Sequence, residues 1–390
     1  MTILVTGADG YIGWPTALRI ASRTDDRVLL VDNFGRREWV EEVGSTSATP
    51  VASIDERLDA AEQTLGLTNL SFVEGDLTEK SFVDELLTVH EPDTIVHAAA
   101  QPAAPYSQIN GERANFTQYN NLQATRNLLW GLEEHDLTDT HFVETTTTGV
   151  YGAPEFPIPE GGATMENQGA SDDVPFPNIG GSWYHATKGF DAQNMRLAHQ
   201  QFGIPISDVR TAITYGTETE ETREDDRLKT RFDFDYYFGT VTHRFCAQAV
   251  AGYPVTVYGK GEQRKPFVSL EDAVEGLAQL ALGDPDDRPE GLTVYNQVTR
   301  AISIVEIAET IADVGGEFDL DVAVEHFENP RDEDETHKME IENDRYAGLI
   351  GGQDQTFEEG VADIFETLTS HAGTITAHED RFLPGVLTDE

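Results

Sequence analysis

The stretch that decides the fold lies at the start of the chain and reads Thr2-Ile3-Leu4-Val5-Thr6-Gly7-Ala8-Asp9-Gly10-Tyr11-Ile12-Gly13. Its apolar beginning predicts a buried strand, and the residues after Gly13 predict a helix. A second apolar run, Val28–Val31, predicts another strand that ends on Asp32. Strand, glycine-rich turn, helix and strand in this order predict a βαβ unit with two parallel strands.

The turn between the first strand and the helix is typical of a dinucleotide-binding loop. Three glycines divide it: Gly7, Gly10 and Gly13. The first two let backbone N–H groups approach a pyrophosphate, and the third lets the helix pack closely on the sheet. Asp32 lies where an acid accepts the adenosine-ribose hydroxyls, and its charge would repel a 2′-phosphate. We therefore predict NAD as the cofactor, while Arg36 and Arg37 nearby leave NADP open.

Further strands are predicted at regular intervals, with helical stretches between most of them: Leu70–Val73, Thr94–His97, His141–Thr145 and Ile206–Thr211. This alternation predicts an α/β fold, a doubly wound parallel Rossmann sheet with a smaller C-terminal substrate-binding lobe. We expect the NAD-binding domain at residues 1–215 and mainly the substrate lobe at 216–390, with segments that cross between them. Two strands around Val255–Phe267 are expected to pair with each other within the smaller lobe.

Residues at the carboxyl edge of the predicted sheet are candidates for cofactor contacts. Asp76 and Leu77 follow the third strand, Ala98 follows the fourth, and Asn121 opens the apolar-spaced run Leu122–Leu129. The predicted cofactor-binding residues are Gly7, Gly10, Tyr11, Ile12, Gly13, Asp32, Asn33, Arg36, Asp76, Leu77, Ala98, Asn121, Tyr184 and Lys188.

The composition is strongly acidic: 71 Asp and Glu against 26 Lys and Arg give a formal net charge of −45. Such a surface disfavours nucleic acid and anionic membranes as partners. An apolar content of 38% together with the strand–helix alternation argues against a disordered acidic protein. We interpret the charge as that of a halophile's cytoplasmic enzyme, whose surface repulsion molar salt would screen within about 3 Å.

Several kinds of site and location are excluded by the same sequence. Cys246 is the only cysteine, so we expect no internal disulfide and no cysteine-based zinc site, and we predict no metal. The first strand begins at the N-terminus, so we expect no signal peptide. No apolar run of about 18 residues predicts a membrane span.

A candidate catalytic pair is found in Tyr184-His185-Ala186-Thr187-Lys188. In a helix, Tyr184 and Lys188 lie one turn apart on the same face. The ammonium favours the tyrosinate, so Tyr184 is a plausible general base near neutral pH, and the same lysine can bind the nicotinamide ribose.

A second candidate element, Glu144-Thr145-Thr146-Thr147-Thr148-Gly149-Val150-Tyr151-Gly152, follows directly on a predicted strand. It resembles the extended short-chain dehydrogenase/reductase family, whose nucleotide-sugar members place a catalytic Ser or Thr four residues before the Tyr of a Val-Tyr-Gly. That position is Thr147. The 4,6-dehydratases of this family carry an Asp-Glu pair next, whereas this chain has Thr148-Gly149, which disfavours that reaction.

A narrower resemblance extends over most of the chain, to about residue 340. Its motifs are Val31-Asp32-Asn33, the insertion Thr49–Ile54, Ala104–Ser107, Gln118–Asn121, Tyr184-His185, Phe238–Thr240, Arg244–Cys246, Val257–Gly261 and Asn329–Arg331. Together they resemble the UDP-sulfoquinovose synthases. The resemblance implies that NAD oxidises C4 of UDP-glucose, that loss of water gives a 4-keto-5,6-ene, that sulfite or a sulfite-donating protein supplies sulfur to C6, and that the hydride then returns. It also implies a homodimer.

The resemblance assigns roles to particular residues. Thr147, Tyr184 and Lys188 would manage oxidation and reduction at C4, with His185 as a fourth catalytic residue facing C6. Arg244 and Arg331 are candidates for the diphosphate of the sugar nucleotide, since guanidinium groups bind phosphates well. The predicted substrate-binding residues are Gln101, Tyr106, Thr147, Arg244, Gln263 and Arg331.

The sequence also departs from that family. Where the plant and cyanobacterial enzymes carry an arginine before Ala-Pro-Tyr-Ser, this chain has Pro102. Loss of a charge-assisted bond to an anion costs about 1.5–3 kcal/mol, which is enough to change a substrate. Arg264 and Lys265 are candidates to restore the charge. The alternatives are therefore an NAD-dependent nucleotide-sugar 4-epimerase of the UDP-glucose type, and a regulatory protein that binds NAD without chemistry.

Overall fold

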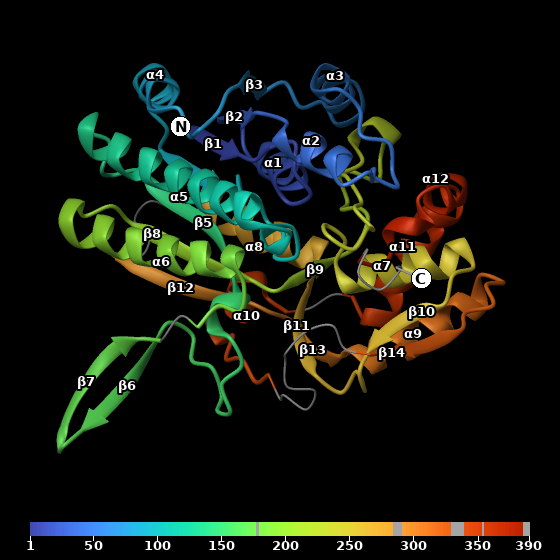
Figure 1. Ribbon diagram of the computed structural model, residues 1–390. Coiled ribbons are helices and arrows are strands. Elements are labelled where there is room, and N and C mark those ends of the chain that lie inside the picture. The colour runs from blue at the N-terminus through green and yellow to red at the C-terminus, as the bar shows by residue number, and fades with distance from the viewer. Residues whose placement is uncertain (177–178, 284–290, 329–338, 353–354, 385–390) are drawn as a thin grey trace.

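The computed structural model describes residues 1–176, 179–283, 291–328, 339–352 and 355–384. Its larger part is built on a seven-stranded sheet (Figure 1). The strands lie in the order β3 (Leu70–Glu74), β2 (Arg27–Asp32), β1 (Thr2–Thr6), β4 (Thr94–His97), β5 (His141–Thr147), β8 (Ile206–Thr211) and β12 (Leu292–Gln297). All neighbouring strands are parallel. The predicted Rossmann sheet is therefore confirmed, and the topological switch point of this sheet lies between β1 and β4.

Helices cover both faces of the sheet, as the alternation of its buried residues requires. On β1, Ile3 and Val5 pack into one apolar cluster and Leu4 packs into another on the opposite face. The first cluster includes residues of α1 (Gly13–Arg23), α3 (Ile54–Leu65) and α8 (Leu270–Leu282). The second includes residues of α4 (Lys80–His90), α5 (Gly111–Glu134) and α6 (Trp183–Phe202). Strands buried on both faces are expected in this three-layer arrangement.

The smaller part of the molecule has its own apolar core and two small sheets. In one sheet β10 (Val255–Tyr258) pairs with β14 (Val324–Phe327). In the other, β11 (Arg264–Ser269) lies between β9 (Ile213–Tyr215) and β13 (Arg300–Ser303). The prediction that the two strands around Val255–Phe267 pair with each other is wrong, because each finds its partner in a distant segment. The surrounding helices are α7 (Val241–Ala251), α9 (Ile304–Glu317), α11 (Phe357–Thr369) and α12 (Ala372–Thr376).

The chain passes more than once between the two parts. After β11, α8 and β12 return to the large sheet, and β13 and α9 then lie in the smaller part (Figure 1). Hydrogen bonds also join the two parts after α2 (Gly35–Glu42). Ala48 N–H donates to Phe232 O at 2.8 Å, and Thr49 Oγ1 donates to Thr230 O at 2.9 Å. The insertion singled out in the sequence therefore fastens the β2–β3 connection to the smaller part.

A β-hairpin, β6 (Gly162–Asn167) and β7 (Ala170–Pro175), projects away from the body of the molecule (Figure 1). The remaining elements are α10 (Asp344–Ile350), which packs against α8, and short 3₁₀ helices at Tyr106–Gln108, Thr148–Tyr151, Asp226–Leu228 and Glu379–Arg381. In the described residues, every helix is too short or too polar to cross a membrane.

Candidate active site

A cavity of about 1370 Å³ opens at the carboxyl edge of the large sheet, between the two parts of the molecule. Its volume exceeds that of an ordinary small-molecule pocket, about 300–1,000 Å³, and suits a dinucleotide together with a second ligand. We call the lining contributed by residues 7–188 the sheet wall. The lining contributed by residues 236–266 is called the lobe wall.

The glycine-rich turn forms one end of the sheet wall, and its geometry leaves no room for larger residues. Gly7 has φ +70°, and a Cβ at this position would lie 2.6 Å from the backbone carbon of Ala98. A Cβ at Gly13, where α1 begins, would lie 2.1 Å from Gly7 O. The backbone of the turn therefore lies against β4 and the start of the helix, which is the arrangement that accepts a pyrophosphate.

Asp32 lies at the end of β2 and lines the same wall. Its Oδ2 accepts a hydrogen bond from Asp9 N–H at 2.8 Å, and its Oδ1 accepts one from Phe34 N–H at 2.7 Å. Burial raises the pKa of Asp32 to about 6, and these backbone donors oppose the rise. Each oxygen keeps a second lone pair, so the carboxylate can still accept ribose hydroxyls.

The two arginines that left NADP open in the sequence are both engaged elsewhere. Arg36 donates to Asp233 Oδ2 at 2.7 Å from Nη2. Arg37 forms a two-pronged pair with Asp9, at 2.7 and 2.8 Å, and also donates to Ala52 O. Each carboxylate also pairs with a second arginine, Asp233 with Arg231 and Asp9 with Arg57. The two arginines are thus held by contacts within the protein, and the carboxylate of Asp32 at the end of β2 fits the ribose hydroxyls of NAD.

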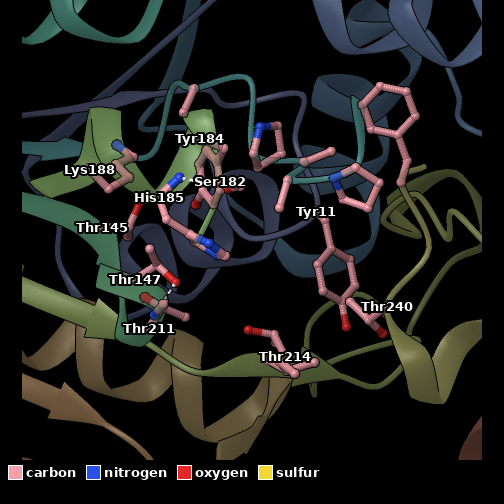
Figure 2. A pocket seen from close by; sticks show the side chains of 18 of the residues that line it. Tyr11, Thr145, Thr147, Ser182, Tyr184, His185, Lys188, Thr211, Thr214 and Thr240 are labelled. Atoms are coloured by element: carbon pink, nitrogen blue, oxygen red, sulfur yellow. Dashed lines mark hydrogen bonds between the residues drawn. The ribbon is translucent and has the colours of Figure 1, made fainter. Parts of the chain in front are cut away.

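Tyr184 and Lys188 lie on α6, which begins beside the cavity. Ser182 caps this helix by accepting from His185 N–H at 3.1 Å, and Tyr184 N–H donates to Ser107 Oγ at 3.2 Å. Thr147 ends β5, and its Oγ1 accepts from Gly149 N–H at 3.1 Å, which fixes its rotamer. Figure 2 shows Thr147, Tyr184, His185 and Lys188 together on one side of the cavity, opposite Tyr11. The structure therefore brings the predicted catalytic residues into one group.

The charges around Tyr184 act in opposite directions. Burial raises the pKa of Tyr184, and the Lys188 ammonium lowers it. Burial by itself lowers the pKa of Lys188, but the carboxylates of Glu144 and Asp191 outweigh this effect and raise it. Lys188 is therefore held in its charged form, which is the form that favours a tyrosinate.

His185 is held in place by two glycines. A Cβ at Gly149 would lie 2.3 Å from His185 Nε2, and a Cβ at Gly180 would lie 2.7 Å from His185 Cβ. The imidazole therefore lies directly over the start of the 3₁₀ helix that follows Thr147. Its ring centre is 5.3 Å from that of Tyr184. This contact explains why glycine follows Thr148, a feature that the threonine run alone does not explain.

The lobe wall supplies two positive charges that face the sheet wall, Arg244 of α7 and Lys265. The uncharged Gln263 lines the same wall. Gln263 is buried, and among the described residues its Oε1 has no hydrogen-bond partner. Arg264 does not line the cavity: its Nη1 donates to Glu306 Oε2 at 2.9 Å. Alternation along β11 therefore separates two neighbouring cations that the sequence had grouped together.

Three predicted site residues lie behind the cavity wall rather than in it. Asn121 Oδ1 accepts from Gln101 N–H at 2.8 Å, and Asn121 Nδ2 donates to Gln101 O at 3.1 Å, so each holds the other. Tyr106 is fully buried and its hydroxyl donates to Glu42 Oε2 at 2.8 Å. None of the three lines the cavity, so the structure gives them supporting positions, and their contact with cofactor or substrate stays a prediction. Arg331 lies outside the described residues.

The other predicted cofactor residues line the sheet wall: Gly7, Gly10, Tyr11, Ile12, Gly13, Asp32, Asn33, Arg36, Asp76, Leu77, Ala98, Tyr184 and Lys188. Sequence reasoning missed several polar residues that line the cavity: Asn120, Thr145, Thr211, Thr214, Thr240 and Tyr258. Thr145 and Thr211 could have been found from their places at the ends of adjacent parallel strands. Thr240 and Tyr258 lie in motifs of the resemblance, Phe238–Thr240 and Val257–Gly261, but nothing in those motifs assigned either side chain to the site. The described residues contain no cluster of three His, Cys, Asp or Glu side chains that could hold a metal ion.

Comparisons with known proteins agree with this geometry. The sequence model of the NAD dependent epimerase/dehydratase family matches residues 3–296. A UDP-sulfoquinovose synthase from Sulfolobus acidocaldarius is 40% identical over 86% of this chain and 84% of its own length. The chloroplastic UDP-sulfoquinovose synthase of Spinacia oleracea is 37% identical over 89% of this chain and 71% of its own length.

Solved structures show the same fold at lower sequence identity. The UDP-glucuronic acid 4-epimerase of Bacillus cereus, solved in complex with UDP-glucuronic acid and NAD, superimposes with a TM-score of 0.69. It covers 95% of this chain and 99% of its own chain, at 21% identity.

Proposed function

The chain belongs to the NAD dependent epimerase/dehydratase family and, within it, to the UDP-sulfoquinovose synthases, and we propose that it converts UDP-glucose and sulfite to UDP-sulfoquinovose. The observation that carries the proposal is the position of His185, held by Gly149 beside Thr147 and Tyr184 at the cavity wall. A 4-epimerase needs acid–base groups at C4 alone. An additional imidazole at this place supports chemistry at a neighbouring carbon.

The proposed reaction is balanced over its four steps. NAD, when bound, would accept the hydride from C4 and later give it back. Tyr184 takes the proton of the C4 hydroxyl as the ketone forms. The ketone acidifies the C5 proton, so that this proton and the C6 hydroxyl leave as water and give the 4-keto-5,6-ene. Sulfite sulfur then bonds to C6, a proton returns to C5, and Tyr184 returns its proton to the C4 oxygen as the hydride returns. The sum is UDP-glucose plus bisulfite, that is sulfite and one proton, to UDP-sulfoquinovose plus water, and the bisulfite proton replaces the one that left C5.

The residues of the sheet wall divide these tasks. Thr147 is oriented by Gly149 N–H, so its hydroxyl hydrogen is available to the C4 oxygen. Tyr184 acts as the base and the acid at C4, and Lys188 stabilises its phenolate. His185 moves the proton between C5 and the leaving C6 hydroxyl.

Sulfite must enter a protein of net charge −45, so local cations have to outweigh the overall repulsion. Arg244 and Lys265 of the lobe wall serve this purpose and that of binding the diphosphate. Ala100, Pro102 and Ala103 line the opposite side, where an arginine is missing. Free sulfite, or sulfite handed over by a donor protein, is the sulfur source that we propose.

The alternative function is NAD-dependent 4-epimerisation of a nucleotide sugar. It uses Thr147, Tyr184 and Lys188 alone, and the missing arginine at Pro102 favours it. Incubation of the purified protein in high salt with UDP-glucose and sulfite separates the two. A sulfite-dependent UDP-sulfoquinovose product supports the synthase, UDP-galactose supports the epimerase, and NAD binding without either product supports a regulatory role.

A homodimer is proposed from the outer face of α5 and α6, which lie side by side (Figure 1). Five large apolar side chains on these two helices are each 49–61% exposed: Tyr119, Trp130, Trp183, Phe190 and Leu197. Spacings of seven and eleven residues place them on one face of each helix. A patch of this kind marks an interface, and two-fold symmetry lets the same patch serve both copies. A monomeric mass by light scattering in high salt would contradict this proposal.

A further inference from the structure

A row of polar side chains runs through the interior of the large sheet, beneath the proposed catalytic residues. In the parallel register, His97 of β4 lies beside Glu144 of β5, and Glu144 lies beside Asp208 of β8. All three are buried. Interior strands of such a sheet normally carry apolar residues, because helices cover both faces. Carboxylates there are costly unless they are paired, so the row has a cost that packing does not explain.

The row reaches the catalytic group through Lys188. Its Nζ lies 3.1 Å from Glu144 Oε1 and 3.7 Å from Asp191 Oδ2, and all three side chains are at most 2% exposed. An ammonium has three N–H donors. One donates to Glu144 Oε1, and Asp191 lies beyond hydrogen-bond distance as an ion-pair partner, so donors remain for the cavity that Lys188 also lines.

The charged and titratable groups around this cluster are few. Asp208 and Arg210 of β8 form their own pair, with Arg210 Nε 3.0 Å from Asp208 Oδ2. From β4, His97 Nε2 lies 3.3 Å from the hydroxyl of Thr125, which in turn lies 3.5 Å from Glu144 Oε1. Burial lowers the pKa of His97 to about 3, so its ring is neutral.

The remaining titratable neighbours lie on α6 and beyond β5. Tyr184 lies one helical turn before Lys188. Arg196, further along α6, faces the Asp208–Arg210 pair, and the Arg210 guanidinium lies 4.8 Å from the ring centre of Tyr151. Lys188 is therefore left with two carboxylates of its own, Glu144 and Asp191.

We propose that Glu144 and Asp191 are positioning residues for Lys188: they hold its ammonium beside Tyr184 and share a single proton, so that the three groups carry no net charge at neutral pH. The proposal rests on the catalytic roles of Tyr184 and Lys188 given above. It assigns no contact with substrate to either carboxylate. We call Glu144, Lys188 and Asp191 the carboxylate–lysine cluster.

The surroundings of the cluster favour retention of that proton. Burial raises the pKa of Glu144 and of Asp191, and Lys188 opposes both shifts. Among the described residues, Glu144 Oε2 has no hydrogen-bond partner, so in the ionised carboxylate this oxygen would be an unsatisfied buried acceptor. Loss of the shared proton at alkaline pH leaves a net negative charge near Tyr184. That charge disfavours the phenolate, so the rate of C4 oxidation should fall on the alkaline side.

The first test is the pH dependence of cofactor reduction by UDP-glucose without sulfite, measured by absorbance on the NAD-loaded enzyme. In Glu144→Gln the side chain keeps nearly the same shape and one oxygen that can accept a hydrogen bond from Lys188, but it cannot ionise. We expect the wild-type rate to rise with pH and then fall, and the alkaline fall to move up by about one pH unit or more in the variant. Asp191→Asn should shift the alkaline fall in the same direction. This variant replaces Glu144→Gln in the test if Glu144→Gln does not fold.

The matched control is Glu221→Gln. Glu221 is also buried and paired with an arginine, Arg19, but it lies on the other face of the sheet, away from the cavity. A merely structural effect of losing a buried carboxylate should lower stability in this variant as well. It should leave the pH profile unchanged.

The second test needs no substrate. Infrared difference spectra between neutral and alkaline pH should show the carbonyl band of one protonated carboxyl in the wild type and in Glu221→Gln. The band should be absent from Glu144→Gln and Asp191→Asn. If UDP-glucose does not reduce the cofactor at all, the proposed synthase function is wrong. The infrared band still tests whether Glu144 and Asp191 share a proton. Absence of the band, or an unchanged alkaline fall in both cluster variants, would overturn it.

Discussion

The two walls of the cavity differ in how their residues come together. The sheet wall is made of short continuous motifs at the carboxyl ends of parallel strands, and its charges are paired inside the wall, as Lys188 is with Glu144. The lobe wall is assembled from α7, from Tyr258 at the end of β10 and from β11, segments that meet only through tertiary pairing. Residues for the chemistry common to the family are therefore positioned by local sequence, whereas the residues proposed to recognise the substrate meet only when distant segments fold together.

The largest effect is expected at the sheet wall, for Tyr184→Phe. Loss of the general base should lower turnover by at least about a hundredfold, while NAD binding measured by fluorescence titration stays close to that of the wild type. Retained NAD binding is the control for a folded site. Turnover near the wild-type value would show that another group takes the proton of the C4 hydroxyl.

A smaller effect is expected at the lobe wall, where Lys265→Gln and Arg264→Gln form a matched pair. Lys265 lines the cavity, whereas Arg264 pairs with Glu306 outside it. Removal of a charge-assisted contact to an anion should raise the KM for sulfite about tenfold in Lys265→Gln, and far less in Arg264→Gln. Steady-state kinetics with sulfite and UDP-glucose varied separately would check this.

The two KM values of Lys265→Gln show which part of the substrates Lys265 contacts. An equal rise in both KM values would place Lys265 at the diphosphate of the sugar nucleotide. No change in either would remove it from the proposed sulfite site and favour the epimerase alternative.

Gly149→Ala tests the contact between the two catalytic elements of the sheet wall. The added methyl group would overlap His185 Nε2, so the imidazole must move. We expect formation of the sulfonated product to slow by about tenfold, the lower range for a displaced acid–base group, with little change in cofactor reduction by UDP-glucose. Gly316→Ala is the control, because a Cβ there meets nothing within 4 Å. An unchanged product rate in Gly149→Ala would argue against a role of His185 at C6.

The smallest effect concerns stability, and a buried histidine behind each wall of the cavity supports it. Burial lowers the pKa of His97 to about 3 and that of His243 to about 4. A lowered pKa means that the folded protein holds these rings neutral, so stability is lost as pH falls below the unfolded value near 6.5. For His243 the loss is about 2 kcal/mol between pH 6.5 and pH 5. Denaturant unfolding of His243→Gln should show a correspondingly smaller decrease, and an equal decrease would contradict the assignment.

Six of the seven strands of the large sheet could be predicted from sequence, because their apolar runs and glycine-rich turns are local signals. β12 was missed, since its run Thr293-Val294-Tyr295 has no neighbouring motif and its place beside β8 is a long-range pairing. The pairing of β10 and β11 was predicted wrongly for the same reason. Short separation along the chain favours a hairpin, but β14 and β13 take their places.

In the site, the sequence located the residues that line the sheet wall through their motifs, but it did not distinguish lining from supporting positions. Gln101 and Asn121 carry side chains suited to a ligand, and the structure engages these side chains with each other instead. The carboxylate–lysine cluster was not predicted at all. Glu144 stands before a run of threonines, and nothing local indicates that it faces Lys188 across β5 and α6.

In the proposed function the sheet wall carries out chemistry at C6 as well as at C4. The most direct measurement uses UDP-glucose labelled with oxygen-18 at C6, incubated with the NAD-loaded enzyme and sulfite in high salt, and follows the product by mass spectrometry. We expect a sulfonated sugar nucleotide that has lost the label, with no net change in the cofactor. A product that keeps the label at C6, such as UDP-galactose, would contradict the claim and leave only epimerisation at C4.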